Sequence, residues 1–316
     1  MNSLLERGAF ILSIDVEPNV KLPRDPICQE VTSLLLELIA QFKIHATWAV
    51  QGNLLLDRNE INVENQLPGV IADYQKLSST ESLAGKPYTR LNRAPSWHGK
   101  SVIQQILSCK TYQEIGCHTF SHIRVGDSSC TREQFEAELK ACQQEFGRFG
   151  VTPYSFVFPW NSVQYVDSLR NYGYIAYRGP SPDWYARLPV FLQRLAHAVD
   201  HWLLIPSPVP TVSCEMGVWN LPASYYYVCG KGWGKMIPTQ LRERKAREGL
   251  RLAVRKRRLF HLWFHPFNLV RNTRVWLRGL ENIFAEVNRY RDSGLLENLT
   301  MGEAAIKFEN SARGRK

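Results

Sequence analysis

The sequence predicts an α/β protein folded as one (β/α) barrel. Short apolar runs alternate with segments of helical periodicity along all 316 residues, which is typical of successive βα units. Polar and ionisable residues follow several of the apolar runs, as they do where parallel strands end in a barrel. Because no repeat, low-complexity tract or linker divides the chain, residues 1–316 are predicted to form a single domain with eight strands or fewer.

The first half of the chain carries clear strand and helix patterns. The helix at 31–42 is predicted because its leucine, isoleucine and phenylalanine residues recur at helical spacing. Residues 57–99 are polar and rich in turn formers, which predicts a long connection. In chain order, the elements predicted for this half are strand 10–14, helix 31–42, strand 46–50, helix 101–107, strand 114–117, helix 131–149 with Thr131 as its cap, and strand 154–158.

The second half is less regular. Residues 206–238 are crowded with proline, glycine and aromatic residues, which predicts a loop. A basic helical segment at about 240–258 and a C-terminal helix at about 273–291 follow it. The other elements predicted for this half are helix 164–172, strand 174–177, strand 202–205 and strand 259–264.

Composition excludes several classes of protein. Hydrophobic residues make up 44% of the chain, but no window supplies the ~18 uninterrupted apolar residues of a membrane span. The first apolar run ends on Asp15 and is too short for a signal peptide, so the protein is expected in the cytoplasm, peripheral to the inner face of the membrane. Seven cysteines without a CxxC pair argue against a zinc ribbon or a disulfide framework.

The positive charge is concentrated in one segment. The net charge is +10, and residues 242–258 carry nine basic side chains against two acidic ones, a local charge of +7. These basic residues point to several faces of a helix and lack interleaved aromatic residues, so specific nucleic-acid binding is not expected. The segment is interpreted either as an ordinary solvated helix or as a helix that makes weak, salt-sensitive contact with an anionic membrane surface beside the barrel mouth, and the second is the prediction to be tested.

Three strand ends carry groups suited to chemistry. Asp15 and Glu17 follow the first strand and point to the same side, where repulsion separates their pKa values or a cation neutralises them. His118 and His122 follow strand 114–117 at a spacing that brings two imidazoles together, and imidazole with carboxylate is the usual ligand set of a catalytic zinc. His265 ends strand 259–264; His261 lies at the start of that strand and is interpreted as a buried structural residue.

These segments resemble the polysaccharide deacetylase family, the NodB-homology group or carbohydrate esterase family 4. The family has an acidic motif after its first strand, an ATFFV-GN strand, an EIG-H-(S/T)-x-x-H motif, an R-x-P loop and a late L-x-H motif. The matching segments run in the same order between about Phe10 and Phe267: Ser13 to Glu17, Ala46 to Asn53, Glu114 to His122, Phe156 to Asn161 and Leu262 to His265.

The resemblance implies a distorted barrel of seven strands and a metal-dependent hydrolase. Its substrate would be an N-acetyl, O-acetyl or formyl group on a sugar of a surface polysaccharide or of a nucleotide- or lipid-linked precursor. Asp15 matches the catalytic base, and His118 and His122 match the ligands of one divalent ion, with zinc as the expected ion. Glu17 substitutes for the family's metal carboxylate, which normally follows the base directly where this chain has Val16.

The resemblance also suggests an acid and a substrate-binding loop. His265 would protonate the leaving amine. Pro159, Trp160, Asn161 and Arg178 are the predicted substrate-binding residues. Val157 stands where the R-x-P loop has its arginine, and Arg178 is the candidate for holding the base carboxylate in its place.

The missing arginine leaves an alternative open, a catalytically inactive sugar-binding barrel of the same fold. A phosphate-binding loop at Gly230 to Lys235 is rejected, because Cys229 stands where that motif needs its first glycine. That segment is interpreted as a mobile aromatic loop over the site.

Overall fold

The computed structural model describes residues 5–17, 25–56, 99–128, 130–203, 205–228 and 237–314. The long connection predicted at 57–99 lies almost wholly outside the described residues, as does the aromatic loop predicted at Gly230 to Lys235. The described elements are β1 (Gly8–Val16), α1 (Asp25–Gln41), β2 (Ala46–Val50), α5 (Gly99–Leu107), β3 (Gln113–Cys117), α6 (Arg132–Gly147), β4 (Ser155–Val157), α7 (Val166–Asn171), β5 (Ala176–Arg178), α8 (Val190–Trp202), β6 (Ser213–Glu215), β7 (Val218–Asn220), β8 (Tyr225–Tyr226), α9 (Thr239–Lys256), β9 (Leu259–Phe264), α10 (Thr273–Asp292), β10 (Leu296–Leu299) and α11 (Met301–Arg313).

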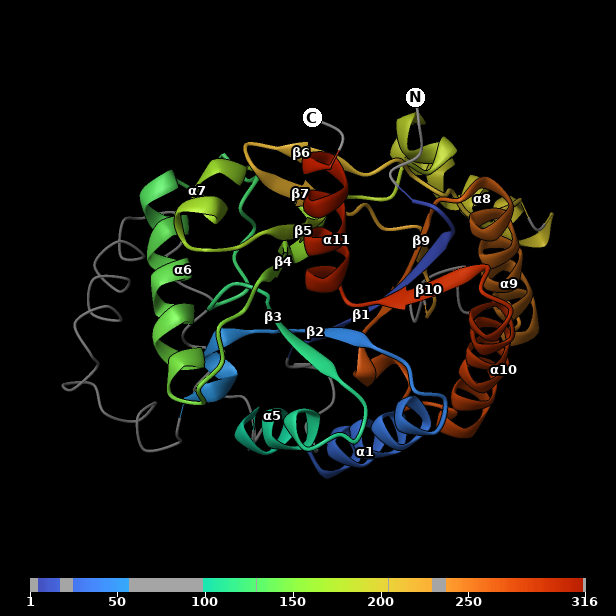
Figure 1. Cartoon of the computed structure of the whole chain (residues 1–316), viewed down its shortest axis with the longest axis horizontal. Helices are drawn as coiled ribbons and strands as arrows, with labels where there is room; N and C mark the ends of the chain where they lie inside the picture. Colours follow the sequence, from blue (N-terminus) through green and yellow to red (C-terminus); the bar gives the residue numbers. More distant parts are fainter. Residues whose placement is uncertain are drawn as a thin grey trace.

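The strands form a curled, distorted (β/α) barrel, as the sequence predicts (Figure 1). The sheet runs in the order β6-β7-β5-β4-β3-β2-β1-β9-β8. The segment from β7 to β8 joins its two ends, because Ala223 N donates to Gly179 O near β5 and Ser224 N donates to His261 O on β9, both at 2.9 Å. Together β7 and β8 therefore occupy one position, and the barrel has the seven strand positions expected.

The strands β6 and β10 are additions to this barrel. β6 pairs antiparallel with β7, and β10 pairs with the first half of β1. Neither was predicted, nor was α11. Their sequences are short and carry charged residues, so their strand character comes from the neighbouring strands rather than from local pattern.

Side chains on the barrel strands alternate between the helical shell and the interior. On β1, Phe10, Leu12 and Ile14 pack into the outer core under the helices, whereas Ala9 and Ile11 belong to a separate inner cluster. Ser13 and Asp15 continue this inward series toward the carboxyl end of the strand. Ala9 and Ile11 therefore face the barrel interior near its amino end, and Ser13 and Asp15 face the same interior near its carboxyl end.

The helix α11 closes the amino end of the barrel, where it crosses the ring of strands in Figure 1. Its residues Met301, Ala304, Ala305 and Phe308 pack in the inner cluster. The buried carboxylate of Glu114 accepts hydrogen bonds from Gly302 N at the start of α11 (2.9 Å) and from Thr47 Oγ1 on β2 (2.8 Å). The amino end is therefore sealed, and the carboxyl end remains as the mouth.

Replacing Phe308 by alanine is expected to destabilise the protein by about 3–5 kcal/mol, because the side chain is fully buried against Trp219 and its removal leaves a cavity. Ile306 lies on the same helix with 51% of its surface exposed, so Ile306→Ala is the matched control and should change stability by about 0.5 kcal/mol or less. Urea unfolding of both variants measures the difference. Equal effects would show that α11 does not seal the core.

Two predictions for the irregular second half are wrong. The described residues of the apolar run at 202–205 include no strand, because Trp202 ends the helix α8 and Leu203 follows in a turn. A run of four apolar residues cannot be distinguished by periodicity from the end of an amphipathic helix. The loop predicted at 206–238 contains the three short strands β6, β7 and β8.

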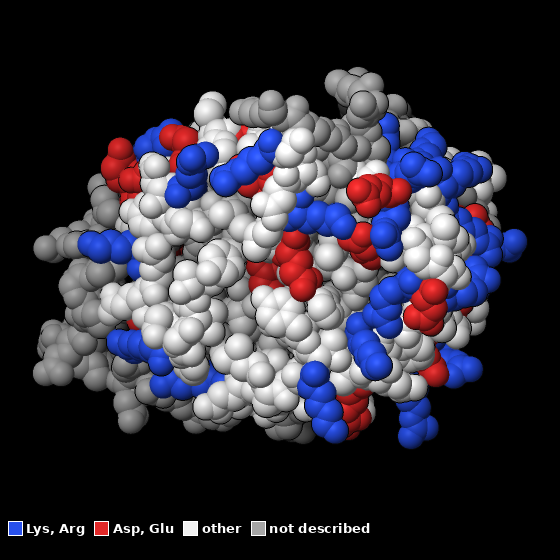
Figure 2. Space-filling model, viewed as in Figure 1, with Lys and Arg blue, Asp and Glu red and all other residues white. Residues whose placement is uncertain are grey.

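The predicted basic helical segment corresponds to α9, but its predicted position beside the barrel mouth is wrong for its most basic part. Arg242 and Lys245 are buried, with Lys245 paired to Asp200. The exposed residues 255–258 lie at the amino end of the barrel, where Arg258 O accepts from Ala9 N on β1. Figure 2 shows Lys and Arg gathered over the side of the molecule where α9 and α10 lie. No helix among the described residues combines the length and apolar character needed to span a membrane.

Candidate active site

Ionisable side chains from several barrel strands meet at the carboxyl end. Val16 on β1 pairs with Val50 on β2, and Val50 pairs with Cys117 on β3, so the residues that directly follow these strands lie at one level. Glu17 and His118 are two of these residues. Arg178 ends β5 and His265 follows β9 in the same way. The structure therefore brings the predicted ionisable residues into one cluster at the mouth.

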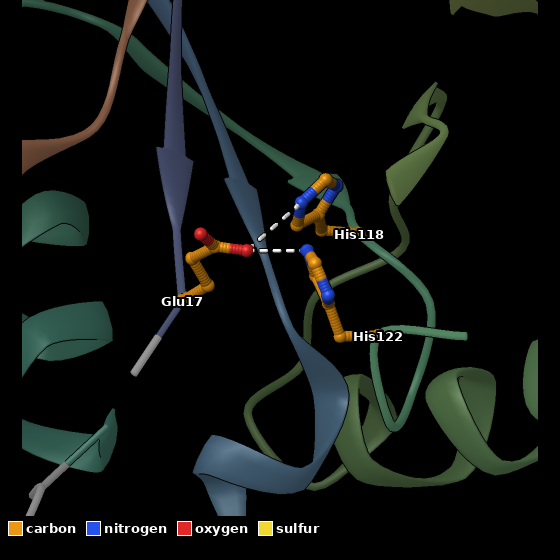
Figure 3. Close-up of side chains that lie close together, drawn as sticks. All are labelled: Glu17, His118 and His122. Atoms are coloured by element: carbon orange, nitrogen blue, oxygen red, sulfur yellow. Dashed lines mark ion pairs between the residues drawn. The ribbon is translucent and has the colours of Figure 1, made fainter. Parts of the chain in front are cut away.

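Glu17, His118 and His122 face one another and could hold a metal ion (Figure 3). Their candidate ligand atoms all lie within 4.8 Å of one another. Glu17 Oε2 is 3.7 Å from His118 Nε2 and forms a closer ion pair with His122 Nε2. Burial raises the pKa of Glu17, but its hydrogen bonds with both histidines outweigh burial, and the net pKa lies far below the usual range. The carboxylate is therefore ionised.

The tautomer of His118 suits metal binding. His118 Nδ1 lies 2.8 Å from the carbonyl oxygen of Val157 on β4, and a carbonyl can only accept. Nδ1 must therefore carry a proton, which makes Nε2, the nitrogen on the side of Glu17, the atom of the ring that is available to a metal. Two imidazoles with one carboxylate are a common set of three protein ligands for catalytic zinc.

The loop between the two histidines is shaped by Glu138, a residue that sequence reasoning missed. Its carboxylate, buried on α6, accepts from the backbone nitrogens of Phe120 (2.7 Å) and Ser121 (2.8 Å). Thr119 and His122 both adopt left-handed backbone conformations, with φ of 57° and 64°. The two imidazoles thus meet across a tight loop rather than on a helical turn. A glutamate among the apolar residues of an amphipathic helix was the available signal.

Asp15 is held by Arg178. The guanidinium donates two parallel hydrogen bonds of 2.7 Å to the carboxylate, from Nη1 to Oδ1 and from Nη2 to Oδ2, and both side chains are almost fully buried. The ring of Trp263 lies under the guanidinium, 4.0 Å from its carbon. Burial raises the pKa of Asp15, but the charge and hydrogen bonds of Arg178 outweigh burial and lower the net pKa below its usual value.

The position of Arg178 relates directly to the arginine that the sequence lacks. Val157 on β4, where the family motif has its arginine, is the Cα partner of Arg178 on β5. Paired residues of neighbouring parallel strands point to the same face, so Arg178 enters the barrel interior at the level of Val157. An arginine one strand away thus reaches the position where the motif's arginine is expected.

His265 completes the cluster opposite the two carboxylates. Its Nε2 lies 3.3 Å from Glu17 Oε1 and 3.9 Å from Asp15 Oδ2. Burial lowers the pKa of His265, and the charges of Asp15 and Glu17 offset part of that effect. His265 is thus placed to hold or release a proton beside Asp15.

The loop predicted to bind substrate forms one side of the mouth. Pro159 is buried at the start of the 3-10 turn η2 (Pro159–Asn161), in which Trp160 and Asn161 adopt left-handed conformations. Trp160 is 68% exposed, and its ring meets that of His122 edge to face, with centroids 5.8 Å apart. Asn161 Oδ1 accepts a long hydrogen bond of 3.4 Å from Arg178 Nη2. The turn therefore presents an exposed aromatic ring beside a candidate metal ligand.

His261 lies beneath this cluster, buried as the sequence suggests. Nδ1 lies 3.0 Å from Leu221 O and Nε2 lies 2.9 Å from Ser13 Oγ, which in turn accepts from Arg178 Nη1 at 2.9 Å. Burial and the nearby Arg178 charge lower the pKa of His261 to about 3, so the ring is neutral. Ser13 was not singled out from the sequence, although its inward position two residues before Asp15 could have indicated it.

Comparison with known proteins identifies the family. Residues 7–174, more than half of the chain, match the family model described as polysaccharide deacetylase. The chain belongs to the polysaccharide deacetylase family. No curated protein matches it significantly.

One of the solved structures that this chain resembles supports its fold. A Mycobacterium smegmatis protein assigned to the polysaccharide deacetylases superposes with a TM-score of 0.61 at 16% identity, covering 96% of this chain and 91% of that one. Peptidoglycan deacetylase PdaC of Bacillus subtilis (TM-score 0.45, 11% identity, 98% and 94% covered) and a CE4-family pseudoenzyme of Bacillus anthracis (0.44, 10%, 92% and 63%) are more distant in structure. The first of these supports the barrel as the fold of this polysaccharide deacetylase family member.

Proposed function

We propose that this protein is a metal-dependent hydrolase that removes an N-acetyl group, or a related O-acetyl or formyl group, from a sugar. The sugar would belong to a surface polysaccharide or to its nucleotide- or lipid-linked precursor. The observation that carries this proposal is the pairing of a buried Asp15–Arg178 ion pair with the Glu17, His118 and His122 cluster at the barrel mouth.

Glu17, His118 and His122 would hold one divalent ion, expected to be zinc, which when bound would polarise an acyl carbonyl and acidify a water. Contacts within the protein orient these ligand side chains. Val157 O fixes the His118 tautomer, and Glu138 fixes the loop that carries His122. These contacts orient the ligands before any ion arrives, which reduces the cost of binding it.

Asp15 would act as the base. Its lowered pKa keeps the carboxylate ionised near neutral pH, and Arg178 holds it in one orientation. Each carboxylate oxygen has a second lone pair beyond the one that accepts from Arg178. Asp15 can therefore take a proton from an attacking water while its pairing with Arg178 stays intact.

His265 would act as the acid. When the bond between the carbonyl carbon and the sugar nitrogen breaks, the departing amine needs a proton. His265 Nε2 lies across from the base and faces the same space as Asp15 and Glu17, so it can supply that proton. Exposed Trp160 beside His122 offers an apolar face on which a sugar ring could rest.

The alternative of an inactive sugar-binding barrel rests on the missing arginine and on Trp160 beside Pro159. Because Arg178 supplies a guanidinium to Asp15 from the neighbouring strand, the first of these two grounds no longer favours it. A purified protein with bound metal but no turnover of any acylated amino sugar would favour the inactive barrel.

The test is metal content and deacylation in the wild type and in His118→Ala. The wild type should bind about one divalent ion and release acetate or formate from acylated amino sugars, whereas His118→Ala should lose most of the metal and of the turnover because one of three ligands is removed. His45, paired with Glu303 at the opposite end of the barrel, provides the control variant His45→Ala, which should retain both. Undiminished metal in His118→Ala, measured by elemental analysis, would contradict the site.

A further inference from the structure

The outward nitrogen of His265 has a partner that the proposed mechanism does not use. Tyr226 Oη lies 3.2 Å from His265 Nδ1, and the two rings meet at an interplanar angle of 89°. Tyr226 comes from β8, the strand that completes the barrel beside β9. Its hydroxyl therefore reaches His265 from the side opposite to the carboxylates.

The direction of this hydrogen bond follows from Asn268, which lies in the 3-10 turn η5 (Pro266–Asn268) directly after His265. Asn268 Nδ2 is 2.6 Å from Tyr226 Oη and 3.4 Å from Val228 O. Since a carbonyl oxygen only accepts, Val228 fixes the amide with its nitrogen toward both groups. Tyr226 Oη thus accepts from Asn268, and its own hydrogen can be donated to His265 Nδ1.

The Tyr226 ring itself has little freedom to move. Tyr226 pairs with Trp263 across the two strands, and their rings lie 4.3 Å apart at a tilt of 32°. Trp263 in turn lies under Arg178. The hydroxyl is therefore held at a fixed place relative to the Asp15–Arg178 pair as well as to His265.

We infer that Tyr226, itself oriented by Asn268, is the positioning residue of His265, which it holds with Nε2 facing Asp15 and Glu17. This inference rests on the proposed function for its catalytic meaning. The contact of Tyr226 Oη with Nδ1 limits rotation of the imidazole, so that Nε2 keeps facing the two carboxylates.

The first test is Tyr226→Phe, which removes the hydroxyl and keeps the ring that packs on Trp263. The kcat for an acylated amino sugar should fall by at least about tenfold and by no more than the ~10²–10⁴-fold that a general acid contributes, with KM and metal content unchanged. Hydrolysis of an activated aryl acetate should be nearly unaffected, because its leaving group departs without a proton. Equal losses on both substrates, or no loss on the amide, would overturn the inference.

Two further variants sharpen this test. Tyr225→Phe removes a hydroxyl from the adjacent residue, whose side chain packs in the outer core, and should leave the ratio of amide to ester hydrolysis unchanged. Asn268→Ala should reduce amide hydrolysis in the wild type but add little in the Tyr226→Phe background, because it acts through the same hydroxyl. Additive losses would show that Asn268 does not act through Tyr226.

Nitrogen-15 NMR of the histidine rings supplies a measurement that needs no turnover, with His265→Gln to assign the signal. In the wild type, neutral His265 should be the Nε2–H form with Nδ1 as acceptor, and Tyr226→Phe should shift it to a mixture of tautomers. An unchanged His265 signal in Tyr226→Phe would refute the positioning role. Absence of amide hydrolysis in the wild type, with the spectral change intact, would instead refute the proposed function alone.

Discussion

Asp15→Asn is expected to retain the metal and to lose about 10²–10⁴-fold of kcat for an acylated amino sugar. Asparagine keeps a carbonyl oxygen for Arg178 but cannot take up a proton at neutral pH. The metal ligands Glu17, His118 and His122 are not altered by this substitution. The loss should therefore fall on turnover rather than on metal binding or on KM.

Elemental analysis and steady-state kinetics of the same preparation test this expectation. Asp127, which lies outside the cluster at a loop position after the second histidine, provides the control Asp127→Asn, for which we expect nearly full turnover. If Asp15→Asn lost its metal along with its activity, Asp15 would be a metal ligand rather than the base. Retained turnover would remove Asp15 from the mechanism altogether.

Much of the candidate site could be predicted because the ends of buried strands can be recognised from the sequence pattern. The strands predicted before Asp15, His118 and His265 are buried, and in a parallel barrel the residues at the carboxyl ends of such strands share one end. The alternation of side chains then directs Ser13 and Asp15 inward together. This logic needs only local pattern, and the structure places all three strand ends at one mouth.

The parts that were missed depend on contacts between distant segments. β10 lacks a strong local signal and is fixed by its pairing with β1. The helix α11 does begin with a capping box of Thr300 and Glu303, a local signal that sequence reasoning missed, and its place at the barrel is fixed by Thr47 and Glu114. The ion pair between Asp15 and Arg178 joins residues 163 positions apart, and Arg178 was anticipated only because the family motif lacks its arginine here and Arg178 follows a predicted strand. Tyr226 sits in a segment whose sequence resembles a loop, because its strand is only two residues long and gains its order from β9. Spacing along the chain cannot reveal such pairings.

Arg178→Val is expected to cost about 3–5 kcal/mol of stability and most of the turnover, because it leaves the Asp15 carboxylate buried without its partner. In the wild type, the lowered pKa of Asp15 contributes stability that is present above its unfolded pKa of about 3.9 and is lost as the pH falls through the folded value. Without the guanidinium, burial raises the pKa of Asp15. The variant therefore loses most stability near neutral pH, where the buried carboxylate is charged and unpaired, and loses less at lower pH, where the carboxylate is protonated. The stability gap between the two proteins should therefore narrow from pH 7 toward pH 4 in denaturant titrations.

The decisive variant returns the arginine to the neighbouring strand. Val157 and Arg178 are paired across β4 and β5 and point to the same face, so Val157→Arg combined with Arg178→Val moves the guanidinium sideways at the same level. The hydrogen bond from His118 Nδ1 to Val157 uses the backbone carbonyl and survives the exchange. If the role of Arg178 is to hold Asp15, the double variant should recover stability and a measurable share of turnover relative to Arg178→Val. A double variant no better than Arg178→Val, while Arg178→Lys retains full turnover, would mean that the barrel needs only a positive charge on β5 and not a bidentate partner for the base.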